Sequence, residues 1–411
     1  MRTEEPWVVA RLPFVTRSLE RLFGGLERFR VWQLPLDPEK LVRRAEATCG
    51  CEFNDRSWWP ALAGIFDAIN TEGRLNALGR MVLTRDVLRL LTHRLQMERD
   101  RQIYPEIAAE KIERPVFIIG LPRTGSTLLH NLLSLNTASF RAPLTWEIMF
   151  PSPPPALANR NVVQAARRDL ALFKFMIPDF SRLHPLEADL PQECVAILSH
   201  TFLSDEFDML FNIPTFAGWL SCQDLTRGYQ YHRNFLQHLQ FGRPTRRMVL
   251  KAPSHMRYFD ELLAVYPDAR IIQTHRRVVE VLPSLANLST TLQKTFTAGV
   301  KPEAVGSSVV REWEEILELF VNARKRVGDD RFIDVYYGDL VANPVTILRQ
   351  IHSALGEVFT PAYKQTVESF LTASGAHNRG LHRYALADFG LDAADLNRRF
   401  SFYGERFGLA T

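Results

Sequence analysis

Hydrophobic residues recur at helical spacing in the N-terminal part of the chain, and strand-like runs appear only later. The segments 17–29 and 75–91 both place apolar side chains three and four residues apart, which would align them on one face of a helix. No alternating strand pattern interrupts them. We therefore predict a helical region over residues 1–112. Because amphipathic helices usually face a core, we expect it to pack against the rest of the protein or a second copy, rather than a membrane surface.

Beyond residue 113 the pattern changes to short apolar runs that alternate with helical segments. The runs have the length and β-branched content of buried parallel strands and occupy 115–119, 247–250, 269–274 and 332–337. Helical spacing follows at 256–265, 278–289 and 307–327. This alternation predicts an α/β fold, in which a parallel sheet is flanked by helices on both faces.

Between the first and second of these runs lies a long segment of different character. The prolines of residues 151–155 exclude helix and strand there, and residues 156–245 are rich in aromatic side chains with mostly helical spacing. We predict that 156–245 is a helical insertion that forms a ligand pocket and its cover. The expected organisation is thus a helical region 1–112 and an α/β domain 113–411 that carries this insertion.

Charge and cysteine usage narrow the class of protein. The formal net charge of +4 over 411 residues is small, which argues against a nucleic-acid-binding face. The spacing of the four cysteines, Cys49, Cys51, Cys194 and Cys222, does not form a disulfide framework and fits a reducing compartment. Neither a signal peptide nor an apolar run of 18 residues is present, so we expect a cytoplasmic chain without a transmembrane segment.

The strongest local motif follows the first strand-like run, from Gly120 to Thr127. Its two glycines lie five residues apart, as in a phosphate-binding loop, and Gly125 can adopt the positive φ that lets backbone approach an anion. A helix begins directly after it, so unpaired N–H groups and the hydroxyls of Ser126 and Thr127 would face a bound phosphate.

The cation of this loop is in an unusual place. A magnesium-dependent nucleotide triphosphatase carries Lys after the second glycine, whereas this chain has Ser126 there and Arg123 inside the loop. This favours one phosphate with an attached leaving group over a magnesium triphosphate. A P-loop kinase or NTPase, and a non-catalytic nucleotide-binding protein, remain the alternatives.

The segment Pro122–Leu129 resembles the 5′-phosphosulfate loop of sulfotransferases that use 3′-phosphoadenosine 5′-phosphosulfate (PAPS), in the bacterial-type branch that is also similar to tyrosylprotein sulfotransferases. The resemblance implies a P-loop-like sheet and in-line transfer of a sulfuryl group from PAPS to an acceptor hydroxyl. It also implies that the 5′-phosphate and the sulfate lie in a cradle of Arg123, Thr124, Gly125, Ser126 and Thr127.

Further residues resemble the other parts of that family's nucleotide site. Arg276 and Ser284 have the spacing of its 3′-phosphate ligands, although Arg277-Val278 departs from the usual residues after the Arg. Lys251 ends a strand-like run and would contact the bridging or sulfuryl oxygens, and Lys251 and Arg123 together would offset charge on the bridging oxygen during transfer. Arg379 and Arg383 resemble a late basic loop that closes over the nucleotide.

The acceptor hydroxyl must lose a proton, so a base is expected near the sulfate. His184 stands in a polar run within the insertion, where related bacterial enzymes use a His. Glu147 is similar to the Glu of tyrosylprotein sulfotransferases, with a register a few residues off. We place His184 ahead of Glu147 and expect no metal, since the spacing of this run fits no zinc set.

The sequence indicates only the general chemical class of the acceptor. The aromatic content of 156–245 suggests a small, apolar hydroxyl compound that is lipid-like or aromatic. The N-terminal helices could also join copies into a homo-oligomer.

Overall fold

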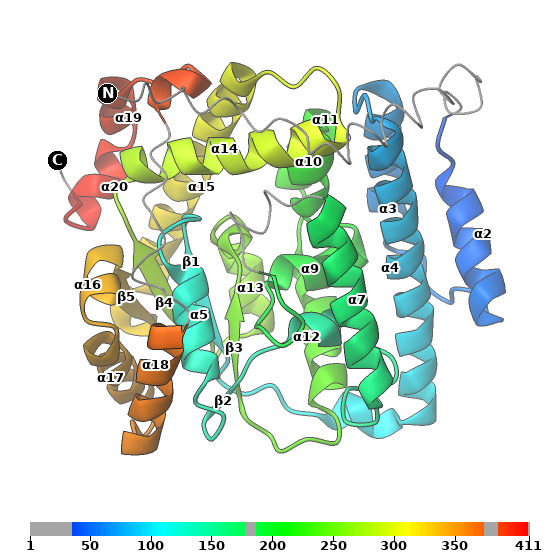
Figure 1. Cartoon of the computed structure of the whole chain (residues 1–411), viewed down its shortest axis with the longest axis horizontal. Coiled ribbons are helices and arrows are strands. Elements are labelled where there is room, and N and C mark those ends of the chain that lie inside the picture. Colours follow the sequence, from blue (N-terminus) through cyan, green and yellow to red (C-terminus); the bar gives the residue numbers. More distant parts are fainter. Residues whose placement is uncertain (1–34, 177–185, 374–384, 410–411) are drawn as a thin grey trace.

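The computed structural model describes residues 35–176, 186–373 and 385–409. It confirms the predicted α/β fold, with a five-stranded parallel sheet in the order β2-β3-β1-β4-β5 (Figure 1). The strands are β1 (Val116–Gly120), β2 (Phe140–Arg141), β3 (Arg247–Lys251), β4 (Arg270–His275) and β5 (Phe332–Tyr336). The four predicted strands thus agree with the structure to within one residue at each end, and the two-residue β2 is the strand that the pattern missed.

Alternate residues of β1 enter two different cores. Val116 and Ile118 pack with α5 (Ser126–Ser134), α17 (Pro344–Leu355) and α18 (Pro361–Ala373) on one face of the sheet. Phe117 and Ile119 face the larger core, to which α12 (Thr226–Gln240), α13 (Phe259–Val265) and α15 (Pro302–Val327) contribute. Burial on both faces explains why the strands are continuously apolar rather than alternating.

The N-terminal helices belong to the same hydrophobic core as the sheet. They are α2 (Pro38–Cys49), α3 (Trp59–Thr71) and α4 (Ala77–Ile103), and buried side chains from all three join the core that contains Phe117. The helical prediction is confirmed for this part, and the helices pack against the rest of the protein, as expected. The core therefore continues across residue 113; the division of the chain there, like the homo-oligomer, stays a prediction. The predicted helix at 17–29 lies outside the described residues.

The predicted insertion is largely helical, as expected. Its helices are α7 (Arg160–Met176), α9 (Cys194–Leu198), α10 (Glu206–Phe211), α11 (Pro214–Ser221) and α12, preceded by α6 (Thr145–Met149). Above them, α14 (Val278–Phe296) crosses the upper part of Figure 1 and packs against both α10 and α15. α14 begins three residues after β4 ends, so α14 and the helix α10 that packs on it lie toward the end of the sheet where the strands end.

The remaining described helices complete the side of the molecule beside β5. They are α16 (Tyr337–Ala342), α19 (Ala393–Arg399) and α20 (Ser401–Arg406). Across the described ranges, no helix is both long and apolar enough to cross a membrane.

Candidate nucleotide and acceptor site

Three adjacent strands end in the three predicted anion-binding segments. Lys251 is the last residue of β3, the loop from Leu121 to Gly125 follows β1, and Arg276 follows β4. Because β1 lies between β3 and β4 in a parallel sheet, all three segments meet at the carboxyl edge of the sheet. Ligands of open α/β sheets usually bind at this edge. Residues up to 153 positions apart are thereby brought to one place, as the Arg123–Arg276 hydrogen bond shows.

The loop after β1 adopts the conformation that its glycines allow. Gly125 has a φ of 84° and directly precedes α5, whose first residue is Ser126. A Cβ atom at Gly125 would lie 3.1 Å from side-chain atoms of Leu340 and Tyr337, so the loop also needs the small residue for space. The first N–H groups of α5 have no partner within the helix and are oriented as an anion site requires.

The side chain of Thr124 points into the protein, unlike those of its neighbours in the loop. Its side chain is fully buried, donates to the carbonyl of Leu121 at 2.6 Å and lies 2.6 Å from the hydroxyl of Thr274 on β4. The hydroxyl therefore ties the loop to the sheet instead of facing the cavity. For the expected phosphate cradle, Thr124 has only its backbone to offer, whereas Arg123, Gly125, Ser126 and Thr127 all line the cavity.

Arg276 connects the second predicted anion site to the loop. Its Nη1 donates to the carbonyl oxygen of Arg123 at 3.2 Å, and its Nε donates to Glu280 at 3.0 Å. The guanidinium lies 4.2 Å from the ring centroid of Tyr337, where a cation is stabilised by the aromatic face. Ser284 lines the same cavity, so the predicted pair occupies one wall.

Lys251 is held at the other side of the loop. It is 4% exposed, its Nζ donates to Thr127 Oγ1 at 3.3 Å, and it forms an ion pair with Glu193. A buried ammonium without an anionic partner would be strongly destabilising. Glu193 supplies that partner, from the residue before α9. From the sequence, Glu193 was expected only to orient His184 or to cap the following helix, and not to contact Lys251.

The carboxylate of Glu147 is held by ion pairs and a backbone hydrogen bond within the protein. It is fully buried, pairs with Arg141 at 3.1 Å and Arg243 at 2.7 Å, and accepts the N–H of Leu144 at 3.0 Å at the start of α6. The cavity lining includes Thr145 of the same helix but not Glu147. These contacts satisfy the carboxylate and turn it away from the cavity. His184, Arg379 and Arg383 lie outside the described residues.

One cavity of about 1900 Å³ contains the loop, Lys251, Arg276 and Ser284, and continues well beyond them. Typical small-molecule pockets measure about 300–1000 Å³, so this one has room for a nucleotide and a second molecule. The far part lies between α4, α10, α14 and α15, and its apolar lining includes Leu285, Leu288 and Leu292 of α14. The sequence predicted that the insertion lines a pocket, but not that α4, α14 and α15 do so too.

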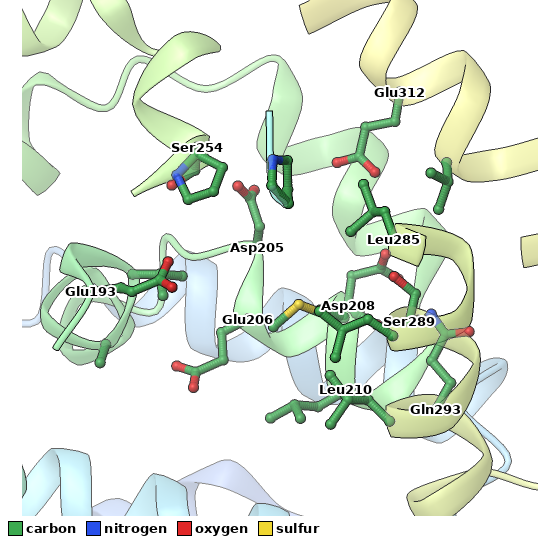
Figure 2. Close-up of a pocket in the computed structure, with 18 of the residues that line it drawn as sticks. Glu193, Asp205, Glu206, Asp208, Leu210, Ser254, Leu285, Ser289, Gln293 and Glu312 are labelled. Atoms are coloured by element: carbon green, nitrogen blue, oxygen red, sulfur yellow. Dashed lines mark hydrogen bonds between the residues drawn. The ribbon is translucent and has the colours of Figure 1, made fainter. Parts of the chain in front are cut away.

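Carboxylates gather in this far part, and we call Asp205, Asp208 and Glu312 the acidic wall. Figure 2 shows Asp205 and Glu312 directed toward the same part of the cavity, with Glu193 on the opposite side of the view. Burial raises the pKa of all three carboxyls: of Asp208 to about 6 and, with the charges of Asp205 and Asp208 adding, of Glu312 to about 8. The nearby Arg257 already pairs with Glu315 at 2.9 Å.

Comparisons with known proteins agree with this geometry. The model of the sulfotransferase family matches residues 115–361. The crystal structure of the sulfotransferase STF1 from Mycobacterium tuberculosis H37Rv has 29% identity and a TM-score of 0.79, over 90% of this chain and 99% of that one. The sulfotransferase STF9 from Mycobacterium avium has 28% identity and a TM-score of 0.80, over 90% of this chain and 96% of that one.

A curated relative adds a named acceptor. The omega-hydroxy-beta-dihydromenaquinone-9 sulfotransferase Stf3 of Mycobacterium bovis is 26% identical over an alignment of 268 residues that covers 61% of this chain. The match spans 66% of the length of that relative. Since the family model covers more than half of the chain, the chain belongs to the sulfotransferase family, as the phosphate loop predicted.

Proposed function

We propose that this protein transfers the sulfuryl group of PAPS to the hydroxyl of a small acceptor. The observation that carries the proposal is the meeting of the phosphate loop, Lys251 and Arg276 at three adjacent strand ends in one cavity. A nucleotide with a phosphate at each side of its ribose needs two separate cationic sites. The loop with Lys251 forms one of them, and Arg276 with Ser284 forms the other.

Most of the predicted nucleotide-binding residues then have a defined task. The backbone N–H groups after Gly125, with Ser126 and Thr127, would hold the 5′-phosphosulfate, and Lys251 would offset charge on its bridging oxygen. Arg276 and Ser284 would hold the 3′-phosphate, since a guanidinium can donate two parallel hydrogen bonds to phosphate. The bound donor supplies the electrophilic sulfur, and Arg379 and Arg383 are proposed to close over it.

Catalysis would come mainly from positioning and preorganised charge. Lys251 is buried before any ligand arrives, so its charge acts in surroundings from which water is largely excluded. Such fixed donors need no reorganisation during the reaction, and holding donor and acceptor in line removes much of the entropic barrier.

The acceptor is proposed to be an apolar, lipid-like or aromatic compound with a free hydroxyl. The apolar side chains of α14 and the size of the cavity beyond the nucleotide site support this. The menaquinone derivative named for the Stf3 relative is a compound of this kind. Besides this apolar lining, the cavity contains the acidic wall, which would accept hydrogen bonds from further donor groups of the acceptor.

Thermal unfolding separates this proposal from nucleotide triphosphate chemistry. Adenosine 3′,5′-bisphosphate (PAP) should raise the melting temperature, and Mg-ATP should leave it unchanged. The reverse pattern would favour a kinase. Labelled PAPS offered with phenols, alcohols and hydroxylated isoprenoids should then give a labelled product. PAP binding with no product from any acceptor would indicate a nucleotide-binding homologue without transferase activity.

A further inference from the structure

We propose that Glu193 is the general base of the transfer and that Lys251 holds it until the sulfuryl donor binds. This inference rests on the proposed function. It assigns the role of general base to Glu193, whereas the sequence offered His184 and Glu147 for that role. It has two parts, a proton acceptor beside the reacting atoms and a coupling between donor binding and the release of that acceptor.

The position of Glu193 is the first argument. Its carboxylate pairs with Lys251, which also donates to Thr127 of the phosphate loop at 3.3 Å. The two side chains of the ion pair are 16% and 5% exposed, and both residues line the cavity. Glu193 therefore lies beside the loop that would hold the sulfuryl group and on the lining of the same cavity.

The other described candidates are held elsewhere. Glu147 is enclosed by Arg141 and Arg243 and does not line the cavity. His130 lies near Lys251, but it is 2% exposed and its Nε2 faces the Val249 carbonyl at 3.1 Å.

The carboxylates farther along the cavity have different partners. Glu206 hydrogen-bonds to Ser199, and Asp208 accepts the N–H of Ile213. In the described residues Glu193 is the carboxylate that contacts both the cavity and the lysine of the sulfuryl site.

Charge compensation supplies the coupling. Before the donor binds, Glu193 is the anion that compensates the buried ammonium of Lys251. A sulfuryl donor brings its own anionic oxygens to Lys251 and competes with Glu193 for it. The displaced carboxylate then lies next to a bound anion, which strengthens it as a base because like charges disfavour ionisation.

The step balances with these groups alone. Glu193 takes the proton of the acceptor hydroxyl while the acceptor oxygen forms a bond to sulfur. The bond between sulfur and the bridging oxygen breaks, and its electron pair leaves with the nucleotide phosphate, whose charge Lys251 offsets. The product is a sulfate ester, PAP and a protonated Glu193, which returns its proton to solvent.

The test compares Glu193→Gln with Glu147→Gln, His184→Ala and a matched control, Glu187→Gln, whose exposed carboxylate pairs with Lys174. Binding of PAPS and PAP is measured by calorimetry, and transfer by labelled PAPS with the acceptor that the parent uses best. We expect Glu193→Gln to lose about 10²-fold or more in kcat, the usual contribution of a general base. It should bind PAPS several-fold more tightly than the parent, since Lys251 is no longer engaged. Glu193→Asp should recover part of kcat, and Glu187→Gln should match the parent in both measurements.

The two readouts distinguish a base from a structural residue. A residue that merely holds the pocket in shape would weaken PAPS binding when changed, so weaker or unchanged PAPS binding in Glu193→Gln overturns the coupling. Parental kcat in Glu193→Gln, with loss in His184→Ala or Glu147→Gln, overturns the base assignment while the proposed function stands. If the parent itself fails to bind PAPS, it is the proposed function that fails.

Discussion

The two ends of the cavity have opposite electrostatics. At the strand ends, Lys251 and Arg276 are cations held by neighbouring groups of the site, such as Glu193 and the Tyr337 ring. In the acidic wall, burial raises the pKa of all three carboxyls, neighbouring carboxylates raise those of Asp208 and Glu312 further, and Arg257 already pairs with Glu315. The comparison shows that one end is organised to receive anions. The end with the acidic wall would be stabilised by a proton or by a hydrogen-bond donor of a ligand.

The sheet accounts for this asymmetry. The cations follow strands whose carboxyl ends are fixed side by side, so their positions are set by strand order. The acidic wall is assembled from α10, its flanking residue Asp205, and α15, and both helices pack against α14. A nucleotide site of this kind is common to a fold, whereas the acceptor end can vary with the helices that cover it.

Lys251→Met tests the basic end and carries the largest expected effect. Removing a preorganised donor from a developing negative charge costs about 10²–10³ in rate, and the change also removes the ion pair with Glu193. We expect sulfuryl transfer to fall by at least that factor in a folded protein. Lys325→Met, at the exposed end of α15, is the control. Transfer within a few-fold of the parent would remove Lys251 from the mechanism.

Arg276→Ala should come next. The change removes a charge-assisted contact worth about 1.5–3 kcal/mol, so PAP affinity should fall by about 10- to 100-fold. Arg277→Ala supplies the matched control, because it removes the same charge from the adjacent position. Arg277 is half exposed, and its guanidinium lies at a long distance, 3.8 Å, from the carboxylate of Glu280. Calorimetry gives both affinities. Similar losses in the two variants would indicate a general effect of charge and not a 3′-phosphate site.

Thr124→Val tests the attachment of the loop to the sheet. It removes the hydrogen bonds to Leu121 and Thr274, so we expect the free energy of unfolding to fall by about 1 kcal/mol. PAP affinity should weaken modestly, since the loop is less well held. Urea unfolding measures the first effect. An unchanged stability would show that the loop keeps its conformation without this contact.

Glu312→Gln tests the acidic wall, at the other end of the cavity. The pKa of this carboxyl rises from 4.5 in the unfolded chain to about 8 in the folded protein, so folding is opposed as the carboxyl of the unfolded chain ionises. This penalty is absent near pH 4, grows above pH 4.5 and is complete above pH 8. The variant should therefore melt at a higher temperature than the parent at pH 9 and at nearly the same temperature at pH 5. Thermal scans at both pH values decide this. A larger gain at pH 5 would contradict the raised pKa.

The parts of the site that follow strands could be predicted from the sequence. The loop has glycine spacing that few other structures require, and Lys251 and Arg276 each come directly after a buried run. Local pattern identifies such segments, and the parallel sheet then places them. The same reasoning located four strands, because burial on both faces leaves a continuous apolar signature.

The parts that depend on tertiary contacts could not be predicted. Glu193 is one of several acidic residues in a polar run, and nothing local shows that it meets a lysine 58 positions away. The direction of the Thr124 hydroxyl is set by Thr274 on another strand. The position of Glu147 after the phosphate loop resembles that of a catalytic Glu, but its ion pairs with Arg141 and Arg243 come from the tertiary structure and could not be read from the sequence.

Calorimetry with two nucleotides tests the central claim most directly. If two separate cationic sites bind the two phosphates of one nucleoside, the chain should bind PAP at least about 100-fold more tightly than adenosine 5′-monophosphate, which lacks the 3′-phosphate. Equal affinities for the two nucleotides would contradict the account.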